Sequence, residues 1–282
     1  MEASIIRAAA IQMDSQDNKD ENLKKAEALI RAAAGAGAKL VVLPELFNFS
    51  GLSEDVAANA EHLEGGRTFN FLGSLAYELG IWLNGGSIYE KIAGSDKCFN
   101  TTLFFDPAGR CAAKYRKVHM FDVDVERGPR YLESESVEAG GQIVVCRTDF
   151  AKIGLAICYD LRFPELFRAQ ALAGAEVLTL PAEFTLNTGK DHWETLVRAR
   201  AVENQAYMIA AGQIGVKKYY QSNGSSMIVD PWGTVVAAAP NKETVVLADM
   251  DLDYVRRVRE SVPSLKNRKP EVYAKSASIQ PN

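Results

Sequence analysis

The 282-residue sequence lacks the features that mark several specialised classes of protein. Its four cysteines and three histidines form neither a CxxC pair nor a Cys–His spacing typical of zinc sites, so no metal is expected. No apolar run approaches the roughly 20 residues that cross a bilayer, so no membrane contact is expected. Lysine and arginine form no long block and the formal net charge is −4, which argues against a nucleic-acid partner.

The cysteine usage and the start of the chain indicate a reducing compartment. The cysteines, Cys98, Cys111, Cys146 and Cys158, are irregularly spaced in a long chain. The first residues, "MEASIIRAAAIQMDS", lack the basic and apolar regions of a signal peptide. Both observations favour free thiols, and we therefore expect a cytoplasmic protein.

Short β-branched apolar runs alternate with helical patterns along the chain. Helices are predicted over 20–38, 68–80, 163–175 and 191–206, and strands over 5–13, 39–44, 81–90, 101–107, 110–117, 142–148, 151–158, 207–214, 225–231, 234–240 and 244–251. No Pro-, Ser- or Gly-rich linker divides the chain, so residues 1–262 are predicted to form one domain. Residues 263–282 carry prolines and charges without periodicity, and we expect them to be disordered or laid against a partner subunit.

One pattern occurs twice, as "GAKLVVLPELF" at 37–47 and as "GAEVLTLPAEF" at 174–184. Unless this is a chance recurrence of a common unit, two such halves predict an internally pseudo-symmetric fold, with two mixed sheets packed on each other and helices outside. The copies differ after the proline, where Glu45 stands in the first and Ala182 in the second. Glu183 is displaced by one position, which in an extended strand directs it to the opposite face.

Cys158 is the best candidate for a nucleophile. It ends an apolar strand in "KIGLAICYDLRFPEL", and Pro164 then opens a helix. A cysteine at a tight strand-to-helix turn lies near backbone N–H groups and a helix N-terminus, which favour the reactive thiolate. The residues alone leave a buried structural cysteine as an equal alternative, and that interpretation is preferred for the other three cysteines.

A nucleophilic cysteine needs a base and a group that stabilises an oxyanion. Glu45 follows a buried strand and has apolar neighbours in "LPELF", a setting in which a carboxylate can both take and return a proton. His119 in "YRKVHMFD" is the alternative base. Lys117 in the same segment is either a fixed cation for the oxyanion or a charge on an edge strand that resists aggregation.

Together these motifs resemble those of the nitrilase superfamily of carbon–nitrogen hydrolases. That family has a Glu after a strand, a Lys in a "YRKxHxFD"-like segment and a Cys in a "GxxICYDxRFPE"-like segment, and Glu45, Lys117 and Cys158 occur here in that order. The resemblance covers nearly the whole chain and is nearest to the omega-amidase and deaminated glutathione amidase branch. It implies a four-layer α-β-β-α sandwich, and a homodimer or larger oligomer in which the tail reaches across the interface.

The resemblance also implies a role for each matching residue. Cys158 is then the nucleophile, Glu45 the general base and acid, and Lys117 the cation on the oxyanion side. The backbone N–H of Tyr159 completes the oxyanion hole, and His119 becomes a structural residue.

Two further positions are implied less uniquely. Glu133 in "YLESES" is the best match for the family's second glutamate, with Glu135 two residues away as the alternative. Arg162 follows the nucleophile by four residues and stands where related amidases bind a substrate carboxylate, unless it forms a structural pair with Glu165.

The implied activity is hydrolysis of the C–N bond of a small carboxylate-bearing amide, such as the omega-amide of a keto acid or deaminated glutathione. The reaction passes through a cysteine thioester, releases ammonia and requires no cofactor. An N-carbamoyl amidohydrolase or a nitrilase with the same residues is the enzymatic alternative. A pseudoenzyme that uses the pocket only to bind a ligand is the alternative from another class.

Overall fold

The computed structural model describes residues 5–124 and 130–275. Its strands form two large mixed sheets and two small hairpins. The first sheet contains β1 (Ile5–Gln12), β2 (Leu40–Val42), β3 (Trp82–Asn84), β4 (Ile88–Lys91), β5 (Cys98–Phe105), β6 (Cys111–Arg116), β9 (Val137–Glu138) and β18 (Thr244–Asp251). The second contains β10 (Val145–Arg147), β11 (Lys152–Leu155), β12 (Val177–Ala182), β13 (Tyr207–Gly212), β16 (Met227–Val229) and β17 (Val235–Ala238). The hairpins pair β7 (Asp122–Asp124) with β8 (Arg130–Leu132), and β14 (Ile214–Val216) with β15 (Gln221–Asn223).

The centres of the two sheets repeat one arrangement. In the first sheet β1, β2 and β3 run parallel, and the antiparallel strands β18 and β5 flank them. In the second sheet β11, β12 and β13 run parallel between the antiparallel strands β10 and β16. The two copies of the repeated sequence pattern contain the equivalent central strands β2 and β12. This equivalence confirms the predicted pseudo-symmetry. Both copies are continuous apolar runs because a central parallel strand buries both of its faces.

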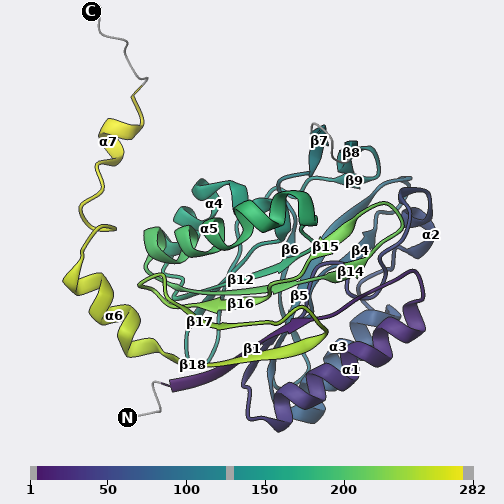
Figure 1. Cartoon of the computed structure of the whole chain (residues 1–282), viewed down its shortest axis with the longest axis horizontal. Helices are drawn as coiled ribbons and strands as arrows, with labels where there is room; N and C mark the ends of the chain where they lie inside the picture. Colours follow the sequence, from purple (N-terminus) through teal and green to yellow (C-terminus); the bar gives the residue numbers. More distant parts are fainter. Residues whose placement is uncertain (1–4, 125–129, 276–282) are drawn as a thin grey trace, which may run out of the picture.

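Helices cover the outer face of each sheet. The helices of the described residues are α1 (Lys19–Gly35), α2 (Val56–Asn59), α3 (Arg67–Leu79), α4 (Pro164–Leu172), α5 (Leu186–Asn204), α6 (Leu252–Ser261) and α7 (Pro270–Tyr273), with single 3₁₀ turns η1 (Ser53–Asp55), η2 (Glu133–Glu135) and η3 (Cys158–Arg162). Figure 1 shows α1 and α3 on one side of the strands and α4 and α5 on the other. The layer order is helix, sheet, sheet, helix, as the sequence predicts.

The helix ends follow local chemistry. The Asn18 side chain accepts hydrogen bonds from the first free N–H groups of α1. Gly80 ends α3 in the left-handed conformation (φ 61°), as predicted, because a glycine has no Cβ to clash there. Helix α5 begins at Leu186 and not at residue 191 as predicted, since the Gly189 N–H donates to the Thr185 carbonyl (2.8 Å). The first turn was missed because "LNTGKD" has no helical apolar pattern.

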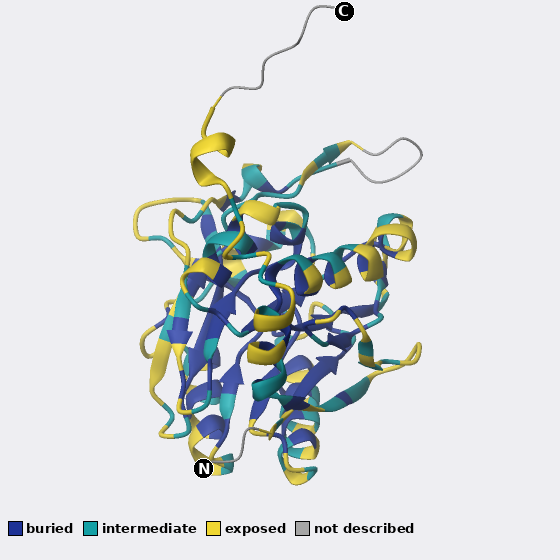
Figure 2. Cartoon of the chain, turned by 90° about the vertical axis from the view of Figure 1, so that its left-hand side faces the viewer, coloured by how far each residue is buried: buried dark blue, intermediate teal, exposed yellow. Residues whose placement is uncertain are grey.

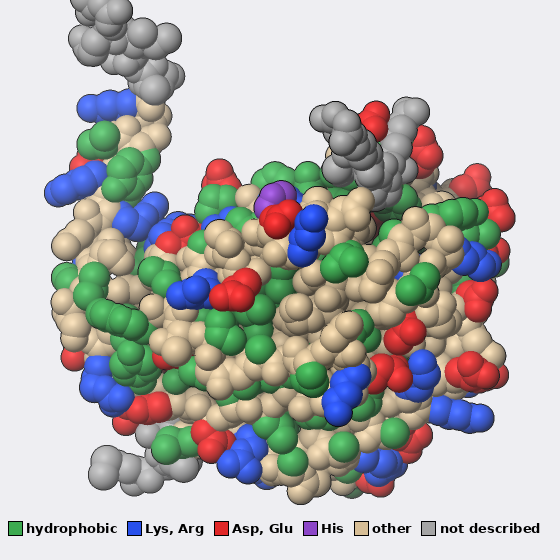
Figure 3. Space-filling view, in the orientation of Figure 1, with side chains coloured by type: hydrophobic (Ala, Val, Ile, Leu, Met, Phe, Trp, Pro, Cys, Tyr) green, Lys and Arg blue, Asp and Glu red, His purple; other side chains and the backbone are tan. Residues whose placement is uncertain are grey.

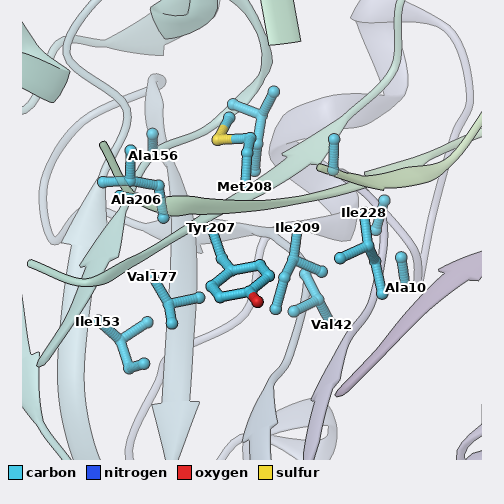
Figure 4. Close-up of a cluster of buried hydrophobic side chains, with 14 of the residues drawn as sticks. Ala10, Val42, Ile153, Ala156, Val177, Ala206, Tyr207, Met208, Ile209 and Ile228 are labelled. Atoms are coloured by element: carbon cyan, nitrogen blue, oxygen red, sulfur yellow. The ribbon is translucent and has the colours of Figure 1, made fainter. Parts of the chain in front are cut away.

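The core is divided by the alternation of side chains along each strand. Ala10 and Val42 from the first sheet share one buried cluster with Ile209 and Ile228 from the second (Figure 4). Strand residues that alternate with these, such as Val41 in β2, face the other way and pack under α1 and α3. Figure 2 shows the resulting pattern, with buried residues concentrated in the inner strands and exposed residues on the outer sides of the packed helices, whereas α7 is exposed throughout.

The surface carries charges of both signs. On the face drawn in Figure 3, Lys and Arg side chains are interspersed with Asp and Glu, without a field of one sign. No helix in the described part of the chain has the length and apolar character needed to cross a membrane.

Candidate active site

Glu45 lies in a tight turn at the end of β2. The next residue, Leu46, has a left-handed backbone (φ 49°), and its N–H donates to the Ser87 hydroxyl (3.0 Å). The turn leaves the Glu45 side chain only 3% exposed beside the buried Phe47. A glutamate at this depth must have hydrogen-bond partners, and the partners define the site.

Lys117 supplies the first of these partners. It follows β6, is 2% exposed, and its Nζ donates to Glu45 Oε1 (3.1 Å) and to both carboxylate oxygens of Glu133 (3.0 and 2.8 Å). Burial alone would lower the pKa of Lys117, but the charges of Glu133 and Glu45 outweigh burial and raise that pKa. The side chain is therefore a buried ammonium ion held between two carboxylates.

Glu133 and Glu135 differ completely in environment. Glu133 is buried in η2, where its Oε2 also accepts the Phe121 N–H (2.7 Å). Glu135 is exposed on the same turn. The fold thus separates Glu133, the better match from sequence, from its alternative Glu135, and of the two only Glu133 contacts Lys117.

Cys158 lies at the predicted turn between a strand and a helix. It adopts a left-handed backbone (φ 46°) at the start of η3, and Pro164 is the first residue of α4. This conformation costs a residue other than glycine about 1–2 kcal/mol. Asp160 holds the turn in place, since its Oδ2 accepts the Ile157 N–H (2.8 Å) and the Tyr115 hydroxyl (2.7 Å). The thiol is thereby presented at the sheet's end in spite of the strain.

The environment of the Cys158 thiol disfavours its ionisation. Burial, followed by the charge of Glu45, raises its pKa well above the ordinary value, and Lys117 offsets only part of this effect. The prediction that the turn favours the thiolate is therefore wrong for the resting site, because burial of the sulfur outweighs the nearby N–H groups. Glu45 and Cys158 line the same cavity, and the Glu45 charge is near enough to raise the pKa of the thiol.

His119 contacts residues that hold the Cys158 turn in place. Its Nδ1 lies 2.7 Å from Asp160 Oδ1, and its ring stacks on Phe163 with 3.7 Å between the centroids. Arg200 supports the same turn by donating to the Leu161 carbonyl (2.9 Å). His119 is thus engaged with the scaffold of the turn.

A cavity of about 420 Å³ opens beside Glu45, Lys117, Glu133 and Cys158. Its other walls are largely aromatic, from Tyr89, Phe121, Tyr131, Tyr159, Phe184, Tyr219 and Tyr220. Within residues 5–124 and 130–275, no group of three or more His, Cys, Asp or Glu residues is arranged to hold a metal ion.

Arg162 lines the same cavity. Its guanidinium stands over the rings of Tyr159 (5.8 Å) and Phe184 (5.3 Å), and its Nη1 is 3.2 Å from His192 Nδ1. Within the described part of the chain it forms no ion pair with Glu165, which is exposed and lines a different groove. The alternative of a structural Arg162–Glu165 pair is therefore not supported.

Glu183 also lines this cavity, which corrects the expectation that it points away from the site. Strand β12 ends at Ala182, so the alternation of an extended strand no longer applies to the next residue. The Glu183 N–H donates to Glu45 Oε2 (2.8 Å), which joins the two copies of the repeated pattern directly.

Asn100 is a site residue that the sequence analysis missed. It is buried in β5, where its Nδ2 donates to Glu45 Oε1 (2.8 Å) and approaches Glu133 Oε1 (3.4 Å). The available signal was a polar amide within the apolar strand "CFNTTLFF", where an unpaired amide would be costly.

The fold agrees with what comparison with known proteins shows. The family model described as carbon-nitrogen hydrolase matches residues 7–260, and the chain belongs to this family. A solved structure from Saccharomyces cerevisiae, a member of the nitrilase superfamily, superposes with a TM-score of 0.85 at 34% identity, over 92% of this chain and 94% of that one.

Two curated relatives place the chain more closely. The omega-amidase of Xenopus tropicalis is 40% identical over 269 residues, which are 95% of this chain and 96% of that protein. The deaminated glutathione amidase of a Synechocystis strain is 42% identical over 267 residues, 93% and 97% of the two chains. The protein is an amidohydrolase of the nitrilase superfamily, which acts on amide C–N bonds other than peptide bonds.

Proposed function

We propose that Cys158, Glu45, Lys117 and Glu133 form the catalytic centre. The observation that carries the proposal is the buried Lys117 ammonium, held between two carboxylates, of which Glu45 also reaches the Cys158 thiol. The protonated resting thiol requires an adjacent base. Glu45 Oε1 accepts from both Lys117 and Asn100, whereas Oε2 accepts from the Glu183 N–H, so we assign the proton to the remaining lone pair of Oε2.

The reaction begins with transfer of the thiol proton to Glu45 and attack of the thiolate on the amide carbon. Lys117 and the N–H of Tyr159 stabilise the oxyanion of the tetrahedral intermediate. Glu45 then gives its proton to the departing nitrogen, the C–N bond breaks, and ammonia leaves a thioester on Cys158. This sequence needs one group that both accepts and donates a proton.

Hydrolysis of the thioester uses the same groups. Glu45 takes a proton from water, the hydroxide attacks the thioester carbonyl, and the C–S bond breaks. The carboxylic acid leaves and the proton returns to the thiolate. Glu133 does not touch the reacting atoms in this scheme, and its two contacts keep Lys117 in place and charged.

The substrate is proposed to be a small amide with a carboxylate, namely the omega-amide of a keto acid or deaminated glutathione, as the names of the relatives suggest. Arg162 at the cavity wall is the proposed partner of that carboxylate. Ammonia release should be compared across α-ketoglutaramate, deaminated glutathione, an N-carbamoyl amino acid and a simple nitrile. Faster turnover of the carbamoyl compound or the nitrile would contradict this substrate class.

Replacement of Arg162 by glutamine is expected to raise KM for the carboxylate-bearing amide about 10- to 100-fold. A hydrogen bond to a charged group is worth about 1.5–3 kcal/mol, and the loss falls on binding. KM for an uncharged amide of similar size serves as the matched control and should change little. Equal losses for both amides would show that Arg162 does not recognise the carboxylate.

We also propose a homodimer or larger oligomer in which the tail, residues 263–282, packs on a partner subunit. Val272 and Tyr273 of α7 are exposed, and Figure 1 shows α7 at the edge of the molecule. Next to the tail is a groove of about 700 Å³ that includes the exposed Trp232. Residues 276–282 of this tail lie outside the described residues.

Removal of residues 263–282 is expected to weaken this association. Light scattering coupled to size exclusion should give at least twice the mass of one chain for the full protein, and a shift toward one chain after truncation. A full-length protein that is monomeric at micromolar concentration would contradict the proposal.

The cytoplasm is the proposed location. All four cysteines are free thiols, including the exposed Cys111, and free exposed thiols are typical of reducing compartments.

A further inference from the structure

Glu183 is a buried carboxylate that the proposed reaction does not use. Its side chain is 5% exposed, and burial raises its pKa. The carboxylate accepts hydrogen bonds from the hydroxyls of Ser50 (3.3 Å) and Ser222 (3.1 Å), and Lys217 Nζ lies 3.8 Å away. These partners come from the segment that follows Glu45 and from the β14–β15 hairpin.

The hairpin is itself fixed to the same stretch of chain. The Asn223 N–H donates to the Phe184 carbonyl (2.8 Å), and Ser222 forms a β-bridge with Thr185. Lys217, between β14 and β15, also donates to Asp14 Oδ1 (2.8 Å). The end of β12, the segment that follows Glu45 and the β14–β15 hairpin therefore meet at Glu183. The Glu183 side chain contacts the latter two segments.

The main chain of the same residue contacts one of the reacting groups. Its N–H donates to Glu45 Oε2 (2.8 Å), the oxygen assigned above to proton transfer. The direction of a peptide N–H depends on the backbone angles of its residue, and an anchored side chain restricts those angles. A rotation here would remove the hydrogen bond that the Glu183 N–H donates to Oε2.

We infer that Glu183 is a positioning residue, whose carboxylate, tied to Ser50 and Ser222, holds the residue's own N–H against Glu45. The inference rests on the proposed role of Glu45 as the base. A direct role in binding substrate is disfavoured because protein donors already occupy the carboxylate. The repeated sequence pattern then has two functions at one site, since one copy supplies the base and the other aligns it.

The test compares Glu183→Ala with Glu183→Gln in the full-length protein. Alanine removes the anchor and is expected to lower kcat about 10- to 100-fold, with a smaller change in KM, because small displacements of a reacting group are costly. Glutamine keeps the hydroxyl contacts and should retain most of kcat. Glu138→Ala, an exposed glutamate in β9, is the matched control and should behave as the unmodified protein.

Two results would overturn the inference: an unchanged kcat in folded Glu183→Ala, or a rise in KM with kcat intact, which would assign Glu183 to substrate binding. If Glu183→Ala does not fold, the double variant Ser50→Ala/Ser222→Ala removes both hydroxyl contacts, and an unchanged kcat there has the same meaning. Glu45→Gln separates the two hypotheses. Full turnover in that variant refutes the proposed function, whereas loss of turnover there together with normal Glu183→Ala refutes only the role of Glu183.

Discussion

Ammonia release is expected to fall by about 10⁴-fold or more when Cys158 is replaced by alanine or serine, with the fold retained. Alanine removes the atom that forms the thioester. Serine keeps a similar shape but carries a much less acidic hydroxyl, which Glu45 alone cannot ionise efficiently. The measurement is the initial rate of ammonia release, with circular dichroism and the unfolding temperature recorded for each variant.

The matched control is Cys111→Ser, which changes an exposed thiol away from the cavity. It should retain normal turnover and normal labelling by iodoacetamide at the active site. Ammonia release that survives in both Cys158 variants would rule out the thioester mechanism. An unmodified protein without turnover on any amide of the panel, together with unlabelled Cys158, would instead favour the ligand-binding pseudoenzyme.

Glu45→Gln is the second large effect, with an expected loss of about 10²- to 10⁴-fold in kcat. Glutamine has a single acceptor oxygen, so it can keep the contacts with Lys117 and Asn100 but loses the one with the Glu183 N–H, and it cannot take the thiol proton. Because burial and the Glu45 charge together hold the Cys158 pKa high, removal of that charge makes the thiol easier to ionise. The variant should therefore form an acyl-enzyme more readily than it hydrolyses one.

Intact-mass measurements after mixing with substrate can show whether the Glu45→Gln variant accumulates such an adduct. His119→Ala is the informative comparison, because a conventional Cys–His pair would make it as damaging as Glu45→Gln. The contact of His119 with Asp160 predicts a milder effect, expressed mainly as lower thermal stability. Equal loss of kcat in folded His119→Ala would restore the histidine as the base.

The charge balance of the site explains why two glutamates accompany one lysine. A lone buried ammonium would be strongly destabilised, and one carboxylate would neutralise it. Glu133 provides that compensation through two contacts, which leaves Glu45 free to change its protonation state during turnover. With a single glutamate, each protonation of that carboxylate would leave the buried Lys117 charge without a counter-ion.

Local pattern determined much of this protein from the sequence alone. The central strands β2 and β12 are continuous apolar runs, because parallel strands in a covered sheet bury both faces. The strand, the turn and Pro164 made Cys158 a candidate beside an equal structural alternative, and Lys117 gained its predicted role only from the resemblance to the nitrilase superfamily. These features depend on neighbours in the chain, and so they are visible without the fold.

The tertiary structure determined those features of the site that depend on residues far apart in the sequence. Glu133 was separated from Glu135 by its contact with Lys117, and His119 was directed to Asp160, 41 residues away. The protonation of Cys158 depends on burial, which no local pattern measures. Glu183 faces the cavity because β12 ends one residue earlier, and its N–H meets Glu45 from 138 residues away. Side-chain direction beyond a strand end and the solvation of a charge are set by packing, and only the assembled sheets fix them.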